Sequence, residues 1–322
     1  MRRMLAALLC LVVLVSLGQD LSRARLYGAD FDVLLHVVDD EGRPLSGAKC
    51  AGWIYLEQAR GHGKGYAEES DSKGYVHLSG KSSEWVRVIV RKDGFYPTRF
   101  EIKYPERGVE EPLVDGKWQP YGATRTVILK RIKEPVPLVR APAGIVPAAP
   151  LDAWHGFDLV RKQWMPPLGD GQCEDVLIRQ SVSSVNDTSE FRVALDVCFT
   201  NVPYAGVLLR KKDGCSERKT AYRADKDVEY KGSLSFVYER RKGLVLQDSR
   251  LDEESYLIFR IRTKVDEKGR LVSAHYGRID GPWEFFGTMR MRAVYFNPKP
   301  NDTNLEDDET VQRVQMGRSG GG

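Results

Sequence analysis

Residues 85–97, WVRVIVRKDGFYP, decide the fold. Every second position from 86 to 90 is valine, which is the period expected of a β-strand with one buried face. The residues KDG that follow are typical of a tight turn, because aspartate and glycine tolerate the backbone angles that turns require. This stretch therefore predicts a half-buried strand that ends in a turn and leads into another extended segment.

The same alternation recurs on both sides of this stretch. Upstream, residues 31–38 read FDVLLHVV, and residues 75–78 extend after a turn-forming SKG. Downstream, residues 98–104 (TRFEIKY) and 124–130 (TRTVILK) extend again. We expect no amphipathic helix of useful length among them. The alternating residues predict a β-sandwich, in which each strand supplies one inward face.

Turns and strands follow one another here in a specific order. A strand leads to an Asp- and Gly-containing turn and a P-L-x-G-A segment, then to an S-D-x-x-G-Y turn, a V-x-V-x-x-x-G-F strand and a closing V-x-L strand. In this order residues 30–132 resemble the carboxypeptidase-regulatory-like domain family. The resemblance implies a transthyretin-like, Ig-like β-sandwich with an accessory, folding or adhesion role and no active site. The matching residues are Val37, Asp40, Gly42, Pro44, Leu45, Gly47, Ala48, Asp71, Gly74, Tyr75, Val88, Val90, Gly94, Phe95, Val127 and Leu129.

A change of composition follows this part of the chain. Residues 133–151, KEPVPLVRAPAGIVPAAPL, are rich in proline and alanine, which is typical of a partly extended linker. A chain of about 300 residues fits two domains of ~100–200 residues each. The sequence therefore predicts an all-β chain of two antiparallel β-sandwich domains joined by this linker.

Short strands recur after the linker, for example FRVALDVCF at residues 191–199. Their regular spacing predicts the second β-sandwich over residues 152–304. Three large residues near its start are predicted to cap the core, with a binding platform as the alternative; they are Trp154, Phe157 and Trp164. Residues 305–322 are acidic and then glycine-rich, which predicts a disordered tail. Parts of this half resemble an uncharacterised group of secreted bacterial proteins, which implies no activity.

The N-terminus predicts export. Arg2 and Arg3 precede an almost wholly apolar run at residues 5–17, LAALLCLVVLVSL. That run has the length of a signal-peptide core, since a membrane-spanning helix needs ~20 apolar residues. Small residues at Ser16 and Gly18 predict cleavage after Gly18. We therefore expect a secreted or periplasmic protein without an integral membrane span after cleavage; an uncleaved anchor is the alternative.

Charge and cysteine content bear on the partners and on the disulfides that this protein can have. The chain has 49 Lys and Arg against 45 Asp and Glu, and the predicted signal peptide removes two of the arginines and no acid. The mature charge is nearly balanced, so we expect no nucleic-acid partner. Four cysteines follow the signal peptide, and an exported protein permits disulfides. Cys198 and Cys215 form one possible disulfide, Cys173 is an equally possible partner, and Cys50 completes the set; four free thiols are the alternative.

Signatures of catalysis are missing from the sequence. It has no GxSxG, HExxH or P-loop motif, and no GxGxxG that follows a strand. We expect a non-catalytic binding or scaffolding protein of the cell envelope or exterior, with neither a cofactor nor a metal ion. The alternative is a secreted hydrolase acting on a glycan, with its site in the second domain where Asp280 and Glu284 flank Trp283.

One binding surface is predicted in the second domain. Arg260 and Arg262 alternate along one expected strand, and Arg290 and Arg292 along another. If these two strands pair, four guanidinium groups share one outer face, beside Trp283. Guanidinium groups bind carboxylates, phosphates and sulfates, so the pattern predicts recognition of an acidic envelope glycan or of an envelope protein. A solvated face neutralised by Glu239 or Glu284 is the alternative.

Overall fold

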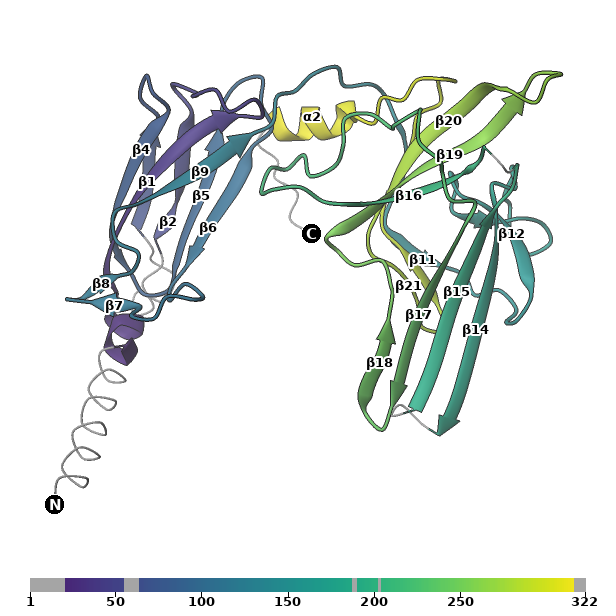
Figure 1. Ribbon diagram of the computed structural model, residues 1–322, viewed down its shortest axis with the longest axis horizontal. Coiled ribbons are helices and arrows are strands. Elements are labelled where there is room, and N and C mark those ends of the chain that lie inside the picture. The colour runs from purple at the N-terminus through teal and green to yellow at the C-terminus, as the bar shows by residue number, and fades with distance from the viewer. Residues whose placement is uncertain (1–20, 55–63, 187–189, 202–203, 316–322) are drawn as a thin grey trace. The chain divides into compact units, whose positions relative to one another are not determined.

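The computed structural model describes residues 21–54, 64–186, 190–201 and 204–315 (Figure 1). The chain divides into two compact units. Unit 1 comprises the residues up to Ile132 together with Gly214–Lys219, and unit 2 comprises Lys133–Asp213 and the residues from Thr220 onward. Multiple antiparallel β-sheets make up the described chain, so the predicted all-β class is confirmed. The predicted signal peptide lies outside the described residues.

The first sheet of unit 1 is built around one long strand, β1 (Ala29–Asp39). Strand β1 pairs antiparallel with β4 and parallel with β8 and β9, so this sheet is not purely antiparallel as predicted. The phenylalanine, valine and leucine at alternate positions of β1 face the core. The other strands of the sheet are β4 (Tyr75–Ser82), β7 (Leu113–Val114), β8 (Lys117–Trp118) and β9 (Ala123–Leu129).

The second sheet of unit 1 has the strand order β3-β2-β5-β6 and is fully antiparallel. Val86, Val88 and Val90 of β5 are buried against the first sheet, as their spacing predicts. Burial of such side chains stabilises the sandwich by ~1.5–3 kcal/mol each. The strands are β2 (Lys49–Ile54), β3 (Lys64–Glu69), β5 (Trp85–Arg91) and β6 (Thr98–Lys103).

An Asp-x-x-Gly sequence forms three of the tight turns. Asp71 Oδ1 accepts backbone hydrogen bonds from Lys73 and Tyr75, and Gly74 has a φ of 80°. The turns that begin at Asp39 and Asp266 repeat this pattern, with the carboxylate accepting from the second and fourth following residues. Aspartate therefore sets these turns by replacing a backbone acceptor, and glycine supplies the left-handed residue.

Unit 2 contains three sheets. A six-stranded sheet has the order β13-β12-β14-β15-β17-β18, a five-stranded sheet β10-β23-β20-β19-β16, and a three-stranded sheet β11-β22-β21. All of their strand pairs are antiparallel. The strands are β10 (Val139–Ala141), β11 (Gly144–Val146), β12 (Trp154–Asp158), β13 (Gln163–Trp164), β14 (Val176–Asn186), β15 (Glu190–Phe199), β16 (Gly206–Lys211), β17 (Ser233–Arg241), β18 (Leu244–Asp248), β19 (Ser255–Val265), β20 (Leu271–Asp280), β21 (Trp283–Phe285), β22 (Met289–Met291) and β23 (Val294–Phe296).

The main core of unit 2 lies between the six-stranded sheet and the two smaller sheets. Strand β19 is buried on both faces. Leu257 and Phe259 enter this core, whereas Tyr256 and Ile258 pack on the opposite side with Tyr230 and neighbouring residues. A further layer therefore covers the outer face of the five-stranded sheet, beyond the two-layered sandwich that the alternation predicts.

The structure differs from two sequence predictions here. Residues 133–151 are not a free linker, because β10 and β11 pair at sheet edges and Leu138 and Val146 are buried. Edge strands tolerate the flanking prolines, which lack the backbone N–H that a central strand would need. Residues 305–315 are ordered as well: Leu305 is buried, and helix α2 (Asp308–Gln315) follows. No helix in the described ranges is long and apolar enough to cross a membrane.

Candidate functional site

The four arginines predicted to share one face are separated. Arg260 and Arg262 lie on β19, which pairs with β16 and β20. Arg290 lies on β22, which pairs with β11 and β21 instead. The prediction is wrong about this pairing, because alternation reports which face a residue occupies but not which strand lies beside it. Only Arg290 and Arg292 share a surface.

Arg260 is a structural residue. It is only 5% exposed. Its Nε donates to the Tyr204 carbonyl oxygen at 2.6 Å, and its Nη1 donates to the Lys226 carbonyl oxygen at 3.3 Å. Its guanidinium also lies 4.1 Å from the ring centroid of Tyr230. These contacts hold the covering layer on β19 and leave Arg260 unable to meet a ligand.

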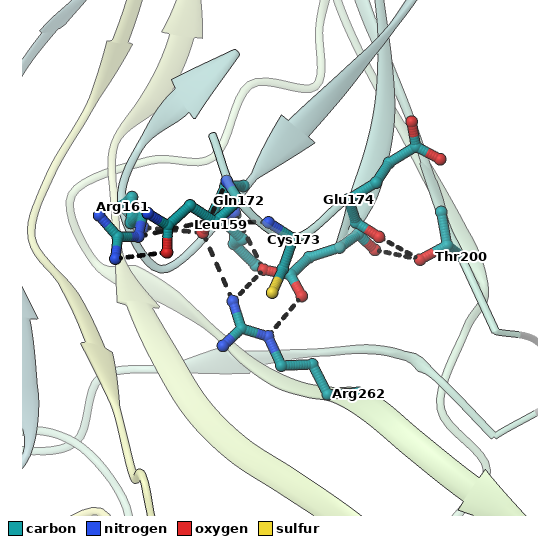
Figure 2. Close-up of polar contacts among 9 residues, drawn as sticks. Leu159, Arg161, Gln172, Cys173, Glu174, Thr200 and Arg262 are labelled. Carbon is teal, nitrogen blue, oxygen red and sulfur yellow. Dashed lines mark hydrogen bonds and ion pairs between the residues drawn. The ribbon is translucent and has the colours of Figure 1, made fainter. Parts of the chain in front are cut away.

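Arg262 joins two sheets through a buried ionic cluster (Figure 2). Its Nε and Nη2 donate to the two carboxylate oxygens of Asp175 at 2.9 and 3.1 Å, and Nη2 lies 3.5 Å from Asp158 Oδ1. A register shift in β19 places Arg262 at a φ of 52°, which turns its side chain toward these acids. Because both carboxylates are buried and two-point contact is strong, this cluster ties β19 to the segment that follows β12.

The acids of this cluster are also bound by backbone groups. Asp158 accepts from the amides of Arg161, Gln172 and Cys173, and Asp175 accepts from the amide of Leu159. Burial raises the pKa of Asp175, and the hydrogen bonds from Arg262 oppose that rise. Since the cluster's charged groups are engaged with one another and with the backbone, we assign it a structural role.

A groove in unit 2 is the candidate functional site. It has a volume of about 840 Å³ and lies over the outer face of the three-stranded sheet. Ile145, Arg290 and Glu284 are register partners across that sheet, so their side chains form one row. Ile145 is 64% exposed. The complete lining is Ala143, Gly144, Ile145, Asp248, Arg250, Leu251, Asp252, Glu253, Pro282, Glu284, Arg290, Met291 and Arg292.

Arg250 organises one wall of this groove. It pairs with Asp248 at 2.6 Å and lies 3.8 Å from Glu284. Its guanidinium also stacks over Tyr238 and Phe286, at 4.0 and 4.9 Å from the ring centroids. The hydrogen bond from Arg250 lowers the pKa of Asp248, which keeps this carboxylate ionised. This wall is therefore rigid and carries compensated charge.

Most of the other charged side chains described in and around the groove form ion pairs, whereas Arg290 does not. Arg292 contacts Glu253 at 3.1 Å, and Lys211 contacts Asp252 at 2.7 Å. Arg290 is exposed and has no carboxylate within ion-pair distance among the described residues. An uncompensated guanidinium in the central row of a groove is available to an anionic ligand group.

The other aromatic and acidic candidates are placed differently from the prediction. Trp283 is fully buried and packs against Phe236, at 5.9 Å between ring centroids, so it offers no binding surface. Its side chain lies on the core face of β21, opposite the face that carries Glu284. Asp280 lies 3.4 Å from Arg278. Of the three large residues predicted to cap the core, Phe157 and Trp164 are buried in it, whereas Trp154 is 41% exposed.

Metal and disulfide sites do not add to this groove. In the described part of the chain, no three His, Cys, Asp or Glu side chains are grouped as metal ligands would be. Cys50, Cys173, Cys198 and Cys215 are all free thiols in the structure. The possible Cys198–Cys215 disulfide is therefore not formed in the structure.

Several groove residues escaped the sequence analysis. Asp248 and Arg250 lie in the segment QDSRLDEES, whose dense charge is a signal that could have marked a functional loop. Ile145 lies within the proline-rich stretch that composition marks as a linker, and no local pattern there reveals an exposed edge strand.

Comparisons with known proteins supply no family. No family model matches the chain, and no curated protein matches it. Among solved structures, 3-chlorocatechol 1,2-dioxygenase from Rhodococcus opacus is 12% identical over 33% of this chain, with a TM-score of 0.26, and the match spans 61% of the dioxygenase. The full-length major pilin SpaD from Corynebacterium diphtheriae is 11% identical, with 86% of this chain and 84% of the pilin covered and a TM-score of 0.22. BcpA, the major pilin subunit of Bacillus cereus, is 10% identical, with 87% and 96% covered and a TM-score of 0.22.

Proposed function

We propose that this chain is an exported, non-catalytic binding protein of the cell envelope or exterior. In this proposal, the groove of unit 2 docks an acidic segment of a partner protein. Export is the role predicted by the N-terminal segment. Docking is supported by the groove's mixture of arginine, carboxylate and aliphatic groups, since arginine is one of the residue types enriched in protein interfaces.

The observation that carries the proposal is the row Ile145–Arg290–Glu284. Arg290 offers an unpaired guanidinium to a carboxylate of the partner, and the exposed Ile145 beside it offers apolar contact. Arg250 and Arg292 are already compensated by acids, so Arg290 gives the groove its preference for an acidic group. The ion-paired carboxylates around Arg290 repel a ligand whose acidic groups face them instead of Arg290.

The experiment is affinity capture with the full chain. Wild-type protein and the variant Arg290→Glu are immobilised and exposed to envelope extracts of the encoding organism, and bound proteins are quantified by mass spectrometry. We expect the variant to lose a defined partner that wild type retains. Arg241→Glu is the matched control, because Arg241 is exposed in the same unit and already pairs with Glu239. Equal capture by wild type and Arg290→Glu would contradict the proposal.

An acidic envelope glycan is the second candidate ligand of the groove. Arg290 and Arg292 would bind its carboxylates or sulfates. A glycan array run on the same two proteins separates the candidates, since a glycan ligand gives signal without any captured protein. Salt sensitivity is expected in both cases, because exposed charges are screened at high ionic strength.

A hydrolase role in unit 2 has less support. A general acid needs a carboxyl group with a raised pKa near its substrate. In the groove, hydrogen bonds from Arg250 and Lys211 lower the pKa values of Asp248 and Asp252. Release of sugars from any array glycan by wild-type protein would favour the hydrolase instead.

For unit 1 we propose the carboxypeptidase-regulatory-like class that its motif suggests. The proposal is supported by the motif glycines Gly42, Gly47, Gly74 and Gly94, which all have φ between 66 and 80°. Such angles favour glycine, which is why a motif of this kind contains it. An accessory adhesion role follows from this class.

A further inference from the structure

The outer face of the second sheet in unit 1 carries exposed side chains. Strands β2, β5 and β6 bury alternate residues against the first sheet, and the intervening side chains face away from the core. Trp53 is the most exposed of the tryptophans in the described chain, at 61%. We call the surface formed by Lys49, Trp53, Gly65, Arg87 and Arg91 the Trp53 face.

Strand register leaves the indole of Trp53 accessible. Its partner on β3 is Gly65, and its partner on β5 is Arg87. Among the described residues, none would lie within 4 Å of a Cβ placed on Gly65, so none of them fills the space on that side of the indole. Arg87 is held by Glu101 at 2.6 Å and stands as a fixed cation on the other side.

Trp85, on the same sheet, differs from Trp53 because cations lie over its ring. The Arg87 guanidinium lies 5.0 Å and the Lys103 ammonium 4.6 Å from its ring centroid. Among the described residues, Trp53 has no such cation over its ring. The exposed indole is therefore available for contact, and tryptophan is enriched at interfaces because its ring joins a large apolar face to a polar N–H group.

Two like charges face each other at the far end of the same surface. Lys49 and Arg91 are register partners across β2 and β5, and Lys49 also lies opposite Glu69 across β2 and β3. Directly opposed like charges destabilise a sheet, and neither side chain has a carboxylate within ion-pair distance among the described residues. A bound anion would relieve this repulsion.

The distance between Trp53 and the Lys49–Arg91 pair fits an extended ligand. Lys49 and Trp53 are four residues apart on one strand, which corresponds to about 13–14 Å. The positions between them carry the small side chains of Ala51 and Ala67, with Ile89 beside them, so the floor is shallow. A chain of a few sugar rings spans this length, with one ring on the indole and its acidic groups at the cationic end.

We propose that the Trp53 face binds an acidic polysaccharide built of uronic acids. The C–H face of one pyranose ring packs on the Trp53 indole, and carboxylates pair with Lys49 and Arg91. A nucleic acid fits less well, because single strands are held by several aromatic rings that stack successive bases, and here one free indole stands on a cationic face. This site is independent of the groove in unit 2 and goes beyond the function proposed for it.

The test measures binding of the full chain to polygalacturonate by titration calorimetry at physiological salt. We expect Trp53→Ala and the double variant Lys49→Gln/Arg91→Gln each to weaken binding about tenfold. The double variant should unfold at about the same temperature as wild type, because it removes the Lys49–Arg91 repulsion together with the cross-strand attraction of Lys49 to Glu69. That second result distinguishes a binding role from a structural one.

Matched controls exist in both units. Trp154→Ala removes an exposed tryptophan of unit 2, and Lys81→Gln removes an exposed lysine on the other sheet of unit 1; neither should change binding. Neutral dextran, polyglutamate and a single-stranded oligonucleotide are titrated in parallel. The proposal is overturned if Trp53→Ala binds polygalacturonate as wild type does, or if polyglutamate or the oligonucleotide binds as tightly as polygalacturonate. Loss of polygalacturonate binding in Trp53→Ala but not in Arg290→Glu supports the proposal for the Trp53 face. This result does not depend on which ligand the groove in unit 2 binds.

Discussion

Arg262 donates two hydrogen bonds to the carboxylate of Asp175, a residue 87 positions earlier in the chain. The arginine comes from β19 of the five-stranded sheet, and the aspartate immediately precedes β14 of the six-stranded sheet. This pair, together with Asp158, joins the two sheets at one end of the core of unit 2 (Figure 2). The stability of unit 2 should therefore depend on one guanidinium.

Replacement of Arg262 by alanine should destabilise unit 2 strongly. The change leaves Asp175 buried without its cation and leaves Asp158 only its longer contact with Arg161, at 3.8 Å, and breaking a buried ion pair from one side costs about 3–5 kcal/mol. Urea unfolding followed by tryptophan fluorescence measures the loss. Arg270→Gln is the control, since Arg270 is exposed and its pair with Asp266 is a surface contact, expected to change stability by less than about 1 kcal/mol. Equal losses in the two variants would contradict the assignment.

The loss in Arg262→Ala should depend on pH. Burial already raises the pKa of Asp175, and Arg262 opposes that rise, so the variant raises the folded-state pKa further above its unfolded value of about 3.9. A raised folded pKa means that folding takes up a proton, and the stability it provides is lost as pH rises through the folded pKa. We therefore expect the deficit of the variant to shrink as the pH falls from 7 toward 4.

A second variant tests whether the Asp175 carboxyl group causes this pH dependence. In Arg262→Ala/Asp175→Asn, position 175 has no ionisable group, so the part of the pH dependence due to Asp175 should disappear. Unfolding curves at several pH values check this. A deficit that stays constant with pH in Arg262→Ala would show that Asp175 does not titrate as we infer.

Gly74 and Gly42 offer a matched pair for testing turn geometry in unit 1. Both have φ near 80°, where a non-glycine residue is strained. A Cβ at Gly74 would lie 2.5 Å from the Val37 carbonyl oxygen, whereas one at Gly42 would meet nothing within 4 Å. Gly42→Ala should therefore cost about 1–2 kcal/mol from backbone strain alone, and Gly74→Ala distinctly more. Thermal unfolding ranks them, and a larger loss in Gly42→Ala would contradict the geometry.

Local patterns in the sequence account for much of the fold. The alternating valines of β5 and the Asp-x-x-Gly turns are properties of short segments, and the structure places them as expected. The edge strands β10 and β11 could not be predicted in this way. Their composition is that of a linker, and they become strands only because β23 and β22, about 150 residues later, present open edges to them.

The site was harder to predict than the fold, because register between distant strands decides it. Arg290 was predicted to face a ligand and does line the groove. Trp283 was expected beside it but lies on the opposite face of its strand, since adjacent residues such as Trp283 and Glu284 point to opposite sides of a sheet. Trp53 gave no signal of its own, because its significance comes from the glycine and the cations that register places around it.

Thiol reactivity provides a last test of packing in unit 1. Cys50 is buried in the core of the sandwich, and desolvation raises the pKa of its thiol to about 12. Because the thiolate is the reactive form, Cys50 should resist alkylation in the native protein, while the exposed Cys173 and Cys215 react within minutes. Mass spectrometry after iodoacetamide treatment, with and without denaturant, measures this difference. Native labelling of Cys50 as fast as that of Cys215 would mean that the core around β2 opens readily.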